Sequence, residues 1–233
     1  MEQRCHDIHG GSVIQQRYSE EAFTSLGKAT YPYRKIKFLN LDKADFKDSP
    51  SIWAVEKEGE VFEFFIYYIP NSRQAILFGT GNTAMGTPNP YFPRCSWGKL
   101  LPCTSICFND PTIYETELTL AWGYGRPDRW FQYDIATILK AILNQLGIDE
   151  RNCLCFGSSG GGTTSAITAA MLGCRATVIN PQLNALHYVP HHVEKFRKYV
   201  CKDGSELIEE RLNLISFLRN SPLAYPRTND CGR

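Results

Sequence analysis

The feature that most constrains this fold is the segment 153–171, in which a short apolar run turns over small residues into an Ala-rich run. Within the turn, Gly157-Ser158-Ser159-Gly160-Gly161 has the spacing G-x-S-x-G. This spacing between a strand and a helix is typical of a sharp turn with an exposed serine at its apex. Larger residues at the flanking glycines would collide with the adjoining strand or helix. We therefore predict an elbow with Ser159 as nucleophile, and an α-helix that begins near Gly160.

Two other structures are alternatives for the same residues, an ordinary turn and a phosphate-binding loop. An ordinary Gly/Ser-rich turn stays open, whereas a phosphate-binding loop is disfavoured, because no Gly-Lys-Ser/Thr follows and the spacing G-x-G-x-x-G is absent. In the elbow, the Gly160 amide stands at a helix N-terminus, where it would stabilise an oxyanion, and Ser158 lies beside it as a further substrate-binding candidate.

The rest of the chain predicts an α/β fold, with a mainly parallel central sheet flanked by helices and an antiparallel hairpin near the N-terminus. Residues 1–30 have few apolar positions and are predicted to be a weakly ordered lead-in to a single domain, 31–233. Strands are expected at 34–39, at 52–55 and 61–69 as a hairpin around the turn 57–60, at 75–78, 104–108 and 153–156, and at 176–179 as a buried strand, with a last one from 223. Helices are expected at 130–146, where an apolar stripe ends at Gly147, and at 206–218, besides the helix after the elbow.

Composition narrows the functional classes. The 25 basic and 24 acidic residues nearly balance, so nothing indicates a nucleic-acid partner. No apolar run is long enough to span a membrane, and the first residues lack the apolar core of a signal peptide. The nine cysteines then favour a reducing, cytoplasmic location. Neither the cysteines near residue 100 nor the pair His191 and His192 have a zinc-site spacing, so we expect no metal or other cofactor.

Two loops are candidates for substrate contacts. Gly79-Thr80-Gly81-Asn82 follows a short buried strand, which is where a second oxyanion-binding amide belongs in a hydrolase, but a Gly-rich surface loop has the same composition. The aromatic segment 120–125 is a plausible pocket wall, although such aromatics are more often core.

Several short motifs together resemble a known group of proteins. They are Ile76-Leu-Phe-Gly79, Tyr91-Phe92 with Ser96-Trp97, Asn109-Asp-Pro111, the elbow, and Asn180-Pro-Gln182. Over residues 73–230 the chain resembles α/β-hydrolase-type proteins predicted among bacterial surface-glycan biosynthesis genes. The resemblance implies a Ser-acid-His acyl-transfer site, with Ser159 as nucleophile, the Gly79 loop at the oxyanion and Asp230 as the acid.

The catalytic histidine of that family follows the acid, but no histidine follows Asp230 in this chain. Three explanations stay open: the chain is a truncated product of a longer gene, a histidine after residue 182 swings in, or the protein is a non-catalytic relative that keeps the pocket. Among the histidines present, His187 is the candidate base. The helical spacing of the residues that follow predicts that His191 and His192 point outward.

The sequence thus predicts serine-dependent acyl transfer, most simply hydrolysis of a carboxylic ester such as an O-acyl group on a carbohydrate. The substrate would be a small molecule or a carbohydrate ester, and no oligomeric state is indicated. The alternatives are an O-acyltransferase with the same residues, and a binding or scaffold protein of a glycan-assembly system without chemistry.

Overall fold

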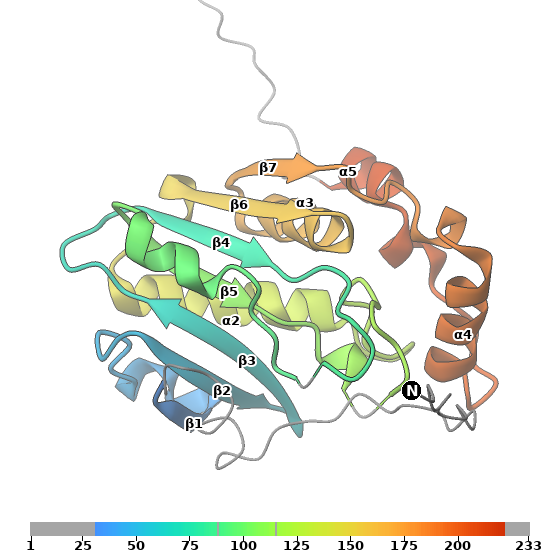
Figure 1. Ribbon diagram of the computed structural model, residues 1–233, viewed down its shortest axis with the longest axis horizontal. Coiled ribbons are helices and arrows are strands. Elements are labelled where there is room, and N and C mark those ends of the chain that lie inside the picture. Colours follow the sequence, from blue (N-terminus) through green and yellow to red (C-terminus); the bar gives the residue numbers. More distant parts are fainter. Residues whose placement is uncertain (1–30, 88, 115, 222–233) are drawn as a thin grey trace, which may run out of the picture.

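The computed structural model describes residues 31–87, 89–114 and 116–221, which form a seven-stranded sheet with helices packed against it (Figure 1). The strand order is β1-β2-β3-β5-β4-β6-β7, and β3 alone among these strands runs against the others. The α/β fold with a mainly parallel sheet is therefore confirmed. The strands are β1 (Tyr33–Lys37), β2 (Ser51–Lys57), β3 (Glu60–Tyr67), β4 (Ala75–Gly79), β5 (Thr104–Phe108), β6 (Cys153–Ser158) and β7 (Arg175–Ile179).

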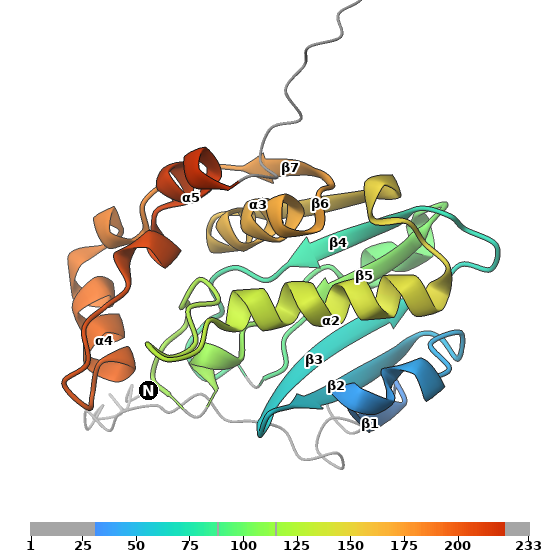
Figure 2. The ribbon, with the colours of Figure 1, turned by 180° about the vertical axis from the view of Figure 1, so that it is seen from behind.

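Helices α2 (Phe131–Leu146) and α3 (Gly160–Leu172) lie on one face of the sheet, as the view from behind shows (Figure 2). The apolar stripe of α2 packs against side chains of the central strands, including Leu77 and Ile106, and forms the main core. The 3-10 helix η2 (Cys95–Leu100) covers the other face, where Phe78 contacts Trp97. Both the hairpin β2–β3 and the helix predicted for 130–146 are confirmed.

Four strands end at the same edge of the sheet. Because β4, β5, β6 and β7 are parallel, the loops that follow Gly79, Phe108, Ser158 and Ile179 all leave from their carboxyl ends. Loops in this position build the ligand sites of open α/β sheets. Helices α4 (Pro190–Val200) and α5 (Leu214–Asn220) lie beyond this edge (Figure 1).

Two predictions about the second half of the chain are wrong. The single helix expected at 206–218 is divided into a 3-10 helix, η6 (Glu209–Leu212), and α5. Asn213 makes the break: its backbone is extended, and its side chain accepts a hydrogen bond from Ser216 N at 2.9 Å, which begins α5 as a new helix.

The strand at 176–179 exists as β7, but it was expected to be buried, and it is instead the last described strand of the sheet with mostly exposed side chains. Its apolar composition is typical of a buried parallel strand, but position in the sheet decides exposure. The lead-in 1–30 and the strand expected from 223 lie outside the described residues, so the division into a lead-in and one domain stays a prediction.

Candidate active site

Ser159 lies at the junction of β6 and α3, as the elbow prediction requires. Its backbone has φ 53° and ψ −132°, a conformation that side-chain-bearing residues rarely adopt. The Ser159 N–H is anchored to Ile179 O at 3.0 Å. A Cβ atom on Gly157 would lie 2.1 Å from Gly161 O, so strand and helix approach each other as closely as glycine permits. The local sequence therefore folds into the sharp turn that its glycines indicate.

The loop after β4 runs against this turn. A Cβ atom on Gly81 would lie 3.2 Å from both Gly161 N and Ser158 O, and one on Gly161 would lie 2.9 Å from Gly81 N. The amides of Gly160 and Gly161 are the first of α3, where N–H groups have no intrahelical acceptor. Backbone amides from two segments thus gather beside Ser159, at a helix N-terminus that favours negative charge.

The side chains of that loop mainly hold the loop itself in place. Gly79 N donates to Ser165 Oγ at 3.2 Å, and the buried Thr80 hydroxyl contacts Phe108 O at 3.0 Å. Asn82 is exposed, and its Oδ1 accepts a hydrogen bond from Thr119. The loop consequently presents backbone groups to the elbow.

The Ser159 hydroxyl has a partner that the sequence had not suggested. Gln182 Nε2 donates to Ser159 Oγ at 2.9 Å, while Gln182 Oε1 accepts from Trp122 Nε1 at 3.3 Å. An indole N–H is only a donor, so it fixes which end of the Gln182 amide faces the serine. Ser159 Oγ therefore accepts this hydrogen bond and keeps its own proton for another acceptor.

The aromatic segment 120–125 forms core rather than a pocket wall. Trp122 and Tyr124 are fully buried, and both pack edge-to-face on Phe196 of α4. The Asp110 carboxylate fastens this segment by accepting Gly123 N–H at 2.6 Å. Burial raises the pKa of Asp110, although hydrogen bonds from Thr112 and Gly123 oppose that rise. The segment acts on the site through Trp122, which positions Gln182.

None of the described histidines makes a hydrogen bond to Ser159. His187 is exposed, and it lines a pocket next to Gln182. His192 does not point outward as expected: it is half-buried against Trp122 and Tyr188, and its Nε2 donates to Leu120 O at 2.9 Å. Burial lowers the pKa of His192 and so favours the neutral ring. His191, on the next position of α4, is exposed as expected, and Asp230 lies outside the described residues.

Ser158 has a different partner. Its Oγ accepts a hydrogen bond from Arg94 Nη2 at 2.8 Å, and the Arg94 guanidinium lies over the rings of Trp97 and Phe156. A cation thus stands beside the residue that precedes the elbow serine. The prediction that Ser158 contacts substrate is not tested by this arrangement.

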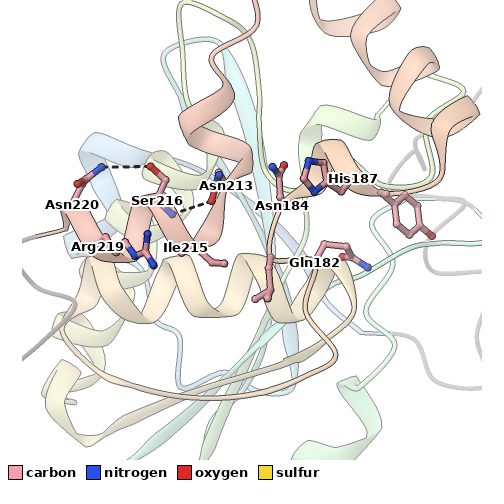
Figure 3. Close-up of a pocket in the computed structure, with 10 residues that line it drawn as sticks. Gln182, Asn184, His187, Asn213, Ile215, Ser216, Arg219 and Asn220 are labelled. Carbon is pink, nitrogen blue, oxygen red and sulfur yellow. Dashed lines mark hydrogen bonds between the residues drawn. The ribbon is translucent and has the colours of Figure 1, made fainter.

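A pocket of about 810 Å³ adjoins the elbow through Gln182 (Figure 3). The side-chain amides of Asn184 and Asn213 are each partly engaged, since each Oδ1 accepts a backbone N–H. Their amino groups are donors that these bonds leave unused. The other lining residues are Leu183, His187, Tyr188, Ile215, Ser216, Arg219 and Asn220.

The sequence did not indicate Gln182 or Arg94 as site residues, and it indicated Trp122 only as part of a pocket wall. Gln182 did belong to a motif, Asn180-Pro-Gln182, but the motif gave no hint that its amide reaches Ser159 across 23 positions. In the described ranges, no group of three or more His, Cys, Asp and Glu side chains is arranged to hold a metal ion. No helix there is both long and apolar enough to cross a bilayer.

Comparison with known proteins shows the fold. No protein-family model matches the sequence, and no curated protein matches it. Among solved structures, the capsule O-acetyltransferase of Neisseria meningitidis serogroup A, in complex with caged gadolinium, aligns with a TM-score of 0.51 at 13% identity, over 73% of this chain and 72% of that one.

Two further solved structures give similar alignments. A mutant of the same acetyltransferase in complex with CoA gives a TM-score of 0.50 at 13% identity, over 81% of this chain and 76% of that one. Esterase 2 of Thermogutta terrifontis, phosphonylated by sarin, gives 0.46 at 15% identity, over 70% of this chain and 65% of that one. The seven-stranded α/β fold of this chain is thus similar to that of the capsule O-acetyltransferase.

Proposed function

We propose that this chain carries out serine-dependent acyl transfer on a carboxylic ester, with Ser159 as nucleophile. The observation that carries the proposal is the Ser159 backbone, at φ 53° and ψ −132°, with the Gly81 loop packed against the first turn of α3. Strain at a polar residue is most often found where the residue has a chemical task. Here it supports a half-buried nucleophile beside the first backbone amides of α3.

In the proposed reaction, Ser159 Oγ attacks the acyl carbon, and the carbonyl oxygen becomes an oxyanion. The amides of Gly81 and Gly160 donate hydrogen bonds to that oxygen, and positioned donors of this kind contribute about 10²- to 10³-fold in rate. The alcohol leaves with a proton, and the acyl group passes from Ser159 to water or to a second hydroxyl.

Proton transfer needs a base that the described partners of Ser159 do not include. Gln182 donates to Ser159 Oγ, so it orients the oxygen but takes no proton. The assignment of Asp230 as an acid that orients a histidine belongs to the proposal, as does a movement of His187 toward Ser159. Because losing the base of a Ser-His pair lowers kcat by orders of magnitude, activity is the decisive readout.

The polar pocket beside Gln182 supports a hydroxyl-rich substrate. Amide, hydroxyl and guanidinium side chains line this pocket (Figure 3) together with the apolar Leu183 and Ile215. This mixture suits a sugar with polar rims and an apolar face. We therefore favour an O-acyl group on a carbohydrate as the ester. Transfer to a glycan hydroxyl, in place of water, would use the same residues.

A fluorophosphonate probe tests the nucleophile directly. We expect covalent labelling of the wild-type chain at Ser159, found by peptide mass spectrometry, and loss of labelling in Ser159→Ala. Ser158→Ala is the matched control, because it removes a hydroxyl one residue away and keeps the proposed nucleophile. Absence of labelling, together with no turnover of p-nitrophenyl acetate above the Ser159→Ala level, would refute catalysis by this chain.

The second candidate is a binding protein that uses the pocket without chemistry. One observation favours it: the described partner of the Ser159 side chain is a neutral amide donor and not a base. In that case the folded protein would be inert to the probe, while acetylated oligosaccharides would still raise its thermal unfolding temperature, equally in wild type and Ser159→Ala.

A further inference from the structure

Arg94 occupies an unusual position beside the elbow. It immediately precedes η2, and its Nη2 donates to Ser158 Oγ at 2.8 Å. The guanidinium carbon lies 5.7 Å from the ring centroid of Trp97 and 5.5 Å from that of Phe156. Two rings and one hydroxyl therefore fix a half-exposed cation one residue away from Ser159.

The Arg94 guanidinium has no carboxylate partner within the described part of the chain. Arg129 provides the comparison, since it also lies over two aromatic rings, those of Phe62 and Phe131, but it forms an ion pair with Asp134 at 2.7 Å. The other arginines that pair with acids are Arg34, Arg126, Arg151 and Arg197.

An arginine of this kind is prepared to bind an anion. Its planar fork has five N–H donors, of which the bond to Ser158 uses one. A guanidinium matches carboxylate and phosphate groups in a bidentate manner, and the aromatic contacts reduce the side-chain entropy that binding would cost. The other donors of this guanidinium belong to a group that is already bound to Ser158, the residue before Ser159.

We propose that Arg94 binds an anionic group, a carboxylate or a phosphate, of the substrate that Ser159 attacks. The proposed ester is therefore negatively charged close to its reacting carbonyl. This inference rests on the proposed function, because only that function makes the bound anion part of a substrate. The anion site itself can be tested without any chemistry. Arg94 acts as a specificity residue that contacts the substrate.

The first test measures binding alone, by isothermal titration calorimetry on the Ser159→Ala chain with succinate and, separately, with inorganic phosphate. We expect at least one of them to bind and Arg94→Gln, added to Ser159→Ala, to weaken that binding about 10- to 100-fold, the usual range for a hydrogen-bonded charge. Binding of succinate alone indicates a carboxylate substrate, and binding of phosphate alone a phosphorylated one.

Matched variants separate recognition from packing. Arg94→Gln keeps an N–H donor for Ser158 but removes the charge, and Arg94→Lys keeps the charge but removes the fork. Arg175→Gln is the control, because Arg175 is an exposed arginine at the amino end of β7, opposite the end where Ile179 pairs with Ser158, and it should leave anion binding unchanged. If Arg94→Gln fails to fold, the Arg94→Lys variant replaces it, and we expect Arg94→Lys to bind the anion more weakly than the parent chain.

The second test uses a pair of esters that differ in charge, p-nitrophenyl acetate and mono-p-nitrophenyl succinate. The wild type should prefer the succinate ester in kcat/KM, and Arg94→Gln should bring the ratio close to one. If the chain turns over neither ester, the proposed function is contradicted. The calorimetry then still tests whether Arg94 binds an anion. Failure of the Ser159→Ala chain to bind either anion, or equally tight binding after Arg94→Gln is added to it, would overturn the anion site.

Discussion

Two turns at the same edge of the sheet each contain a residue with a side chain at positive φ, and different contacts hold the two turns in place. Glu58, between β2 and β3, has φ 51°, and Ser159, between β6 and α3, has φ 53°. Both follow strands that run in the same direction, so both are at the carboxyl edge. They differ in what holds them and in which polar groups remain unused.

Charged side chains hold the β2–β3 turn. Arg129 donates to the carbonyl oxygens of Lys57 and Glu58 at 2.7 and 2.8 Å, and the buried Asp134 carboxylate accepts from Lys57 Nζ and Arg129 Nε, both at 2.7 Å. A Cβ atom on Gly59 would meet nothing within 4 Å, so its surroundings are open. The polar groups of this turn attach the hairpin to α2.

Backbone contact holds the Ser159 turn. Gly157 and Gly161 touch where no side chain fits, and Gly81 lies against both segments of the elbow. The amides of Gly160 and Gly161, the first two of α3, have no intrahelical acceptor, and the Ser159 hydroxyl accepts a hydrogen bond from Gln182. The comparison teaches that positive φ does not distinguish the two turns, whereas the backbone donors beside Ser159 do.

The largest effect that we expect from this comparison is that of an alanine in the elbow. Gly157→Ala puts a Cβ atom 2.1 Å from Gly161 O, which is backbone and cannot move aside, and should destabilise the fold by more than about 4 kcal/mol. Gly59→Ala is the control, with open space but φ 81°, and should cost about 1 kcal/mol. Urea unfolding compares them. Equal losses in the free energy of unfolding would show that close backbone packing does not distinguish the Ser159 turn from the β2–β3 turn.

Removal of the charge that holds the hairpin should come next. Asp134→Asn leaves Lys57 and Arg129, both largely buried, without their anion and is expected to cost about 3 kcal/mol in the free energy of unfolding. Lys57→Met, combined with it, should recover part of that loss. Fluorophosphonate labelling of Ser159 in the folded variant should stay at the wild-type rate. A slowed reaction would mean that the two turns are coupled.

Trp122→Phe probes how Gln182 is held at the elbow. The variant keeps an aromatic ring against Phe196 but removes the indole N–H that Gln182 Oε1 accepts. We expect a loss of about 1 kcal/mol in stability. Labelling at Ser159 should also slow several-fold, because the Gln182 amide can then rotate. Tyr124→Phe, which removes a buried hydroxyl bound by Ile208 N, is the control that should lose stability without slowing the label.

The smallest expected effect is a pH dependence from His192. Burial, together with His191 and Lys195, lowers its pKa in the folded state below the ordinary value of 6.5. The unfolded chain therefore binds a proton first, so the contribution is complete above pH 6.5 and is lost as the pH falls through the lowered folded value. His192→Gln should flatten the plot of the free energy of unfolding against pH between pH 5 and 8, whereas His191→Gln, which removes only a secondary cause of the shift, should flatten it much less. An unchanged pH profile in His192→Gln would contradict this assignment.

The structure also corrects which groups surround the proposed nucleophile. His192 was expected to point outward because α4 packs Val193 and Phe196 inward, yet its ring fits between Trp122 and Tyr188 and reaches Leu120 O. Helical spacing predicts which positions share a stripe, but the width of the buried stripe depends on what packs beside it. His187, the favoured base, makes no hydrogen bond with Ser159 within the described residues.

The sequence by itself determined the local elements whose causes are local. Glycines at 157, 160 and 161 predicted the elbow, the turn 57–60 predicted the hairpin, and an apolar stripe ending at Gly147 predicted α2, because steric fit and periodicity act over a few residues. Only the tertiary structure decided that Gln182 meets Ser159 and that Arg94 reaches Ser158. Those contacts join segments far apart in the chain, and their geometry is fixed by how the sheet brings strand ends together, which no local pattern encodes.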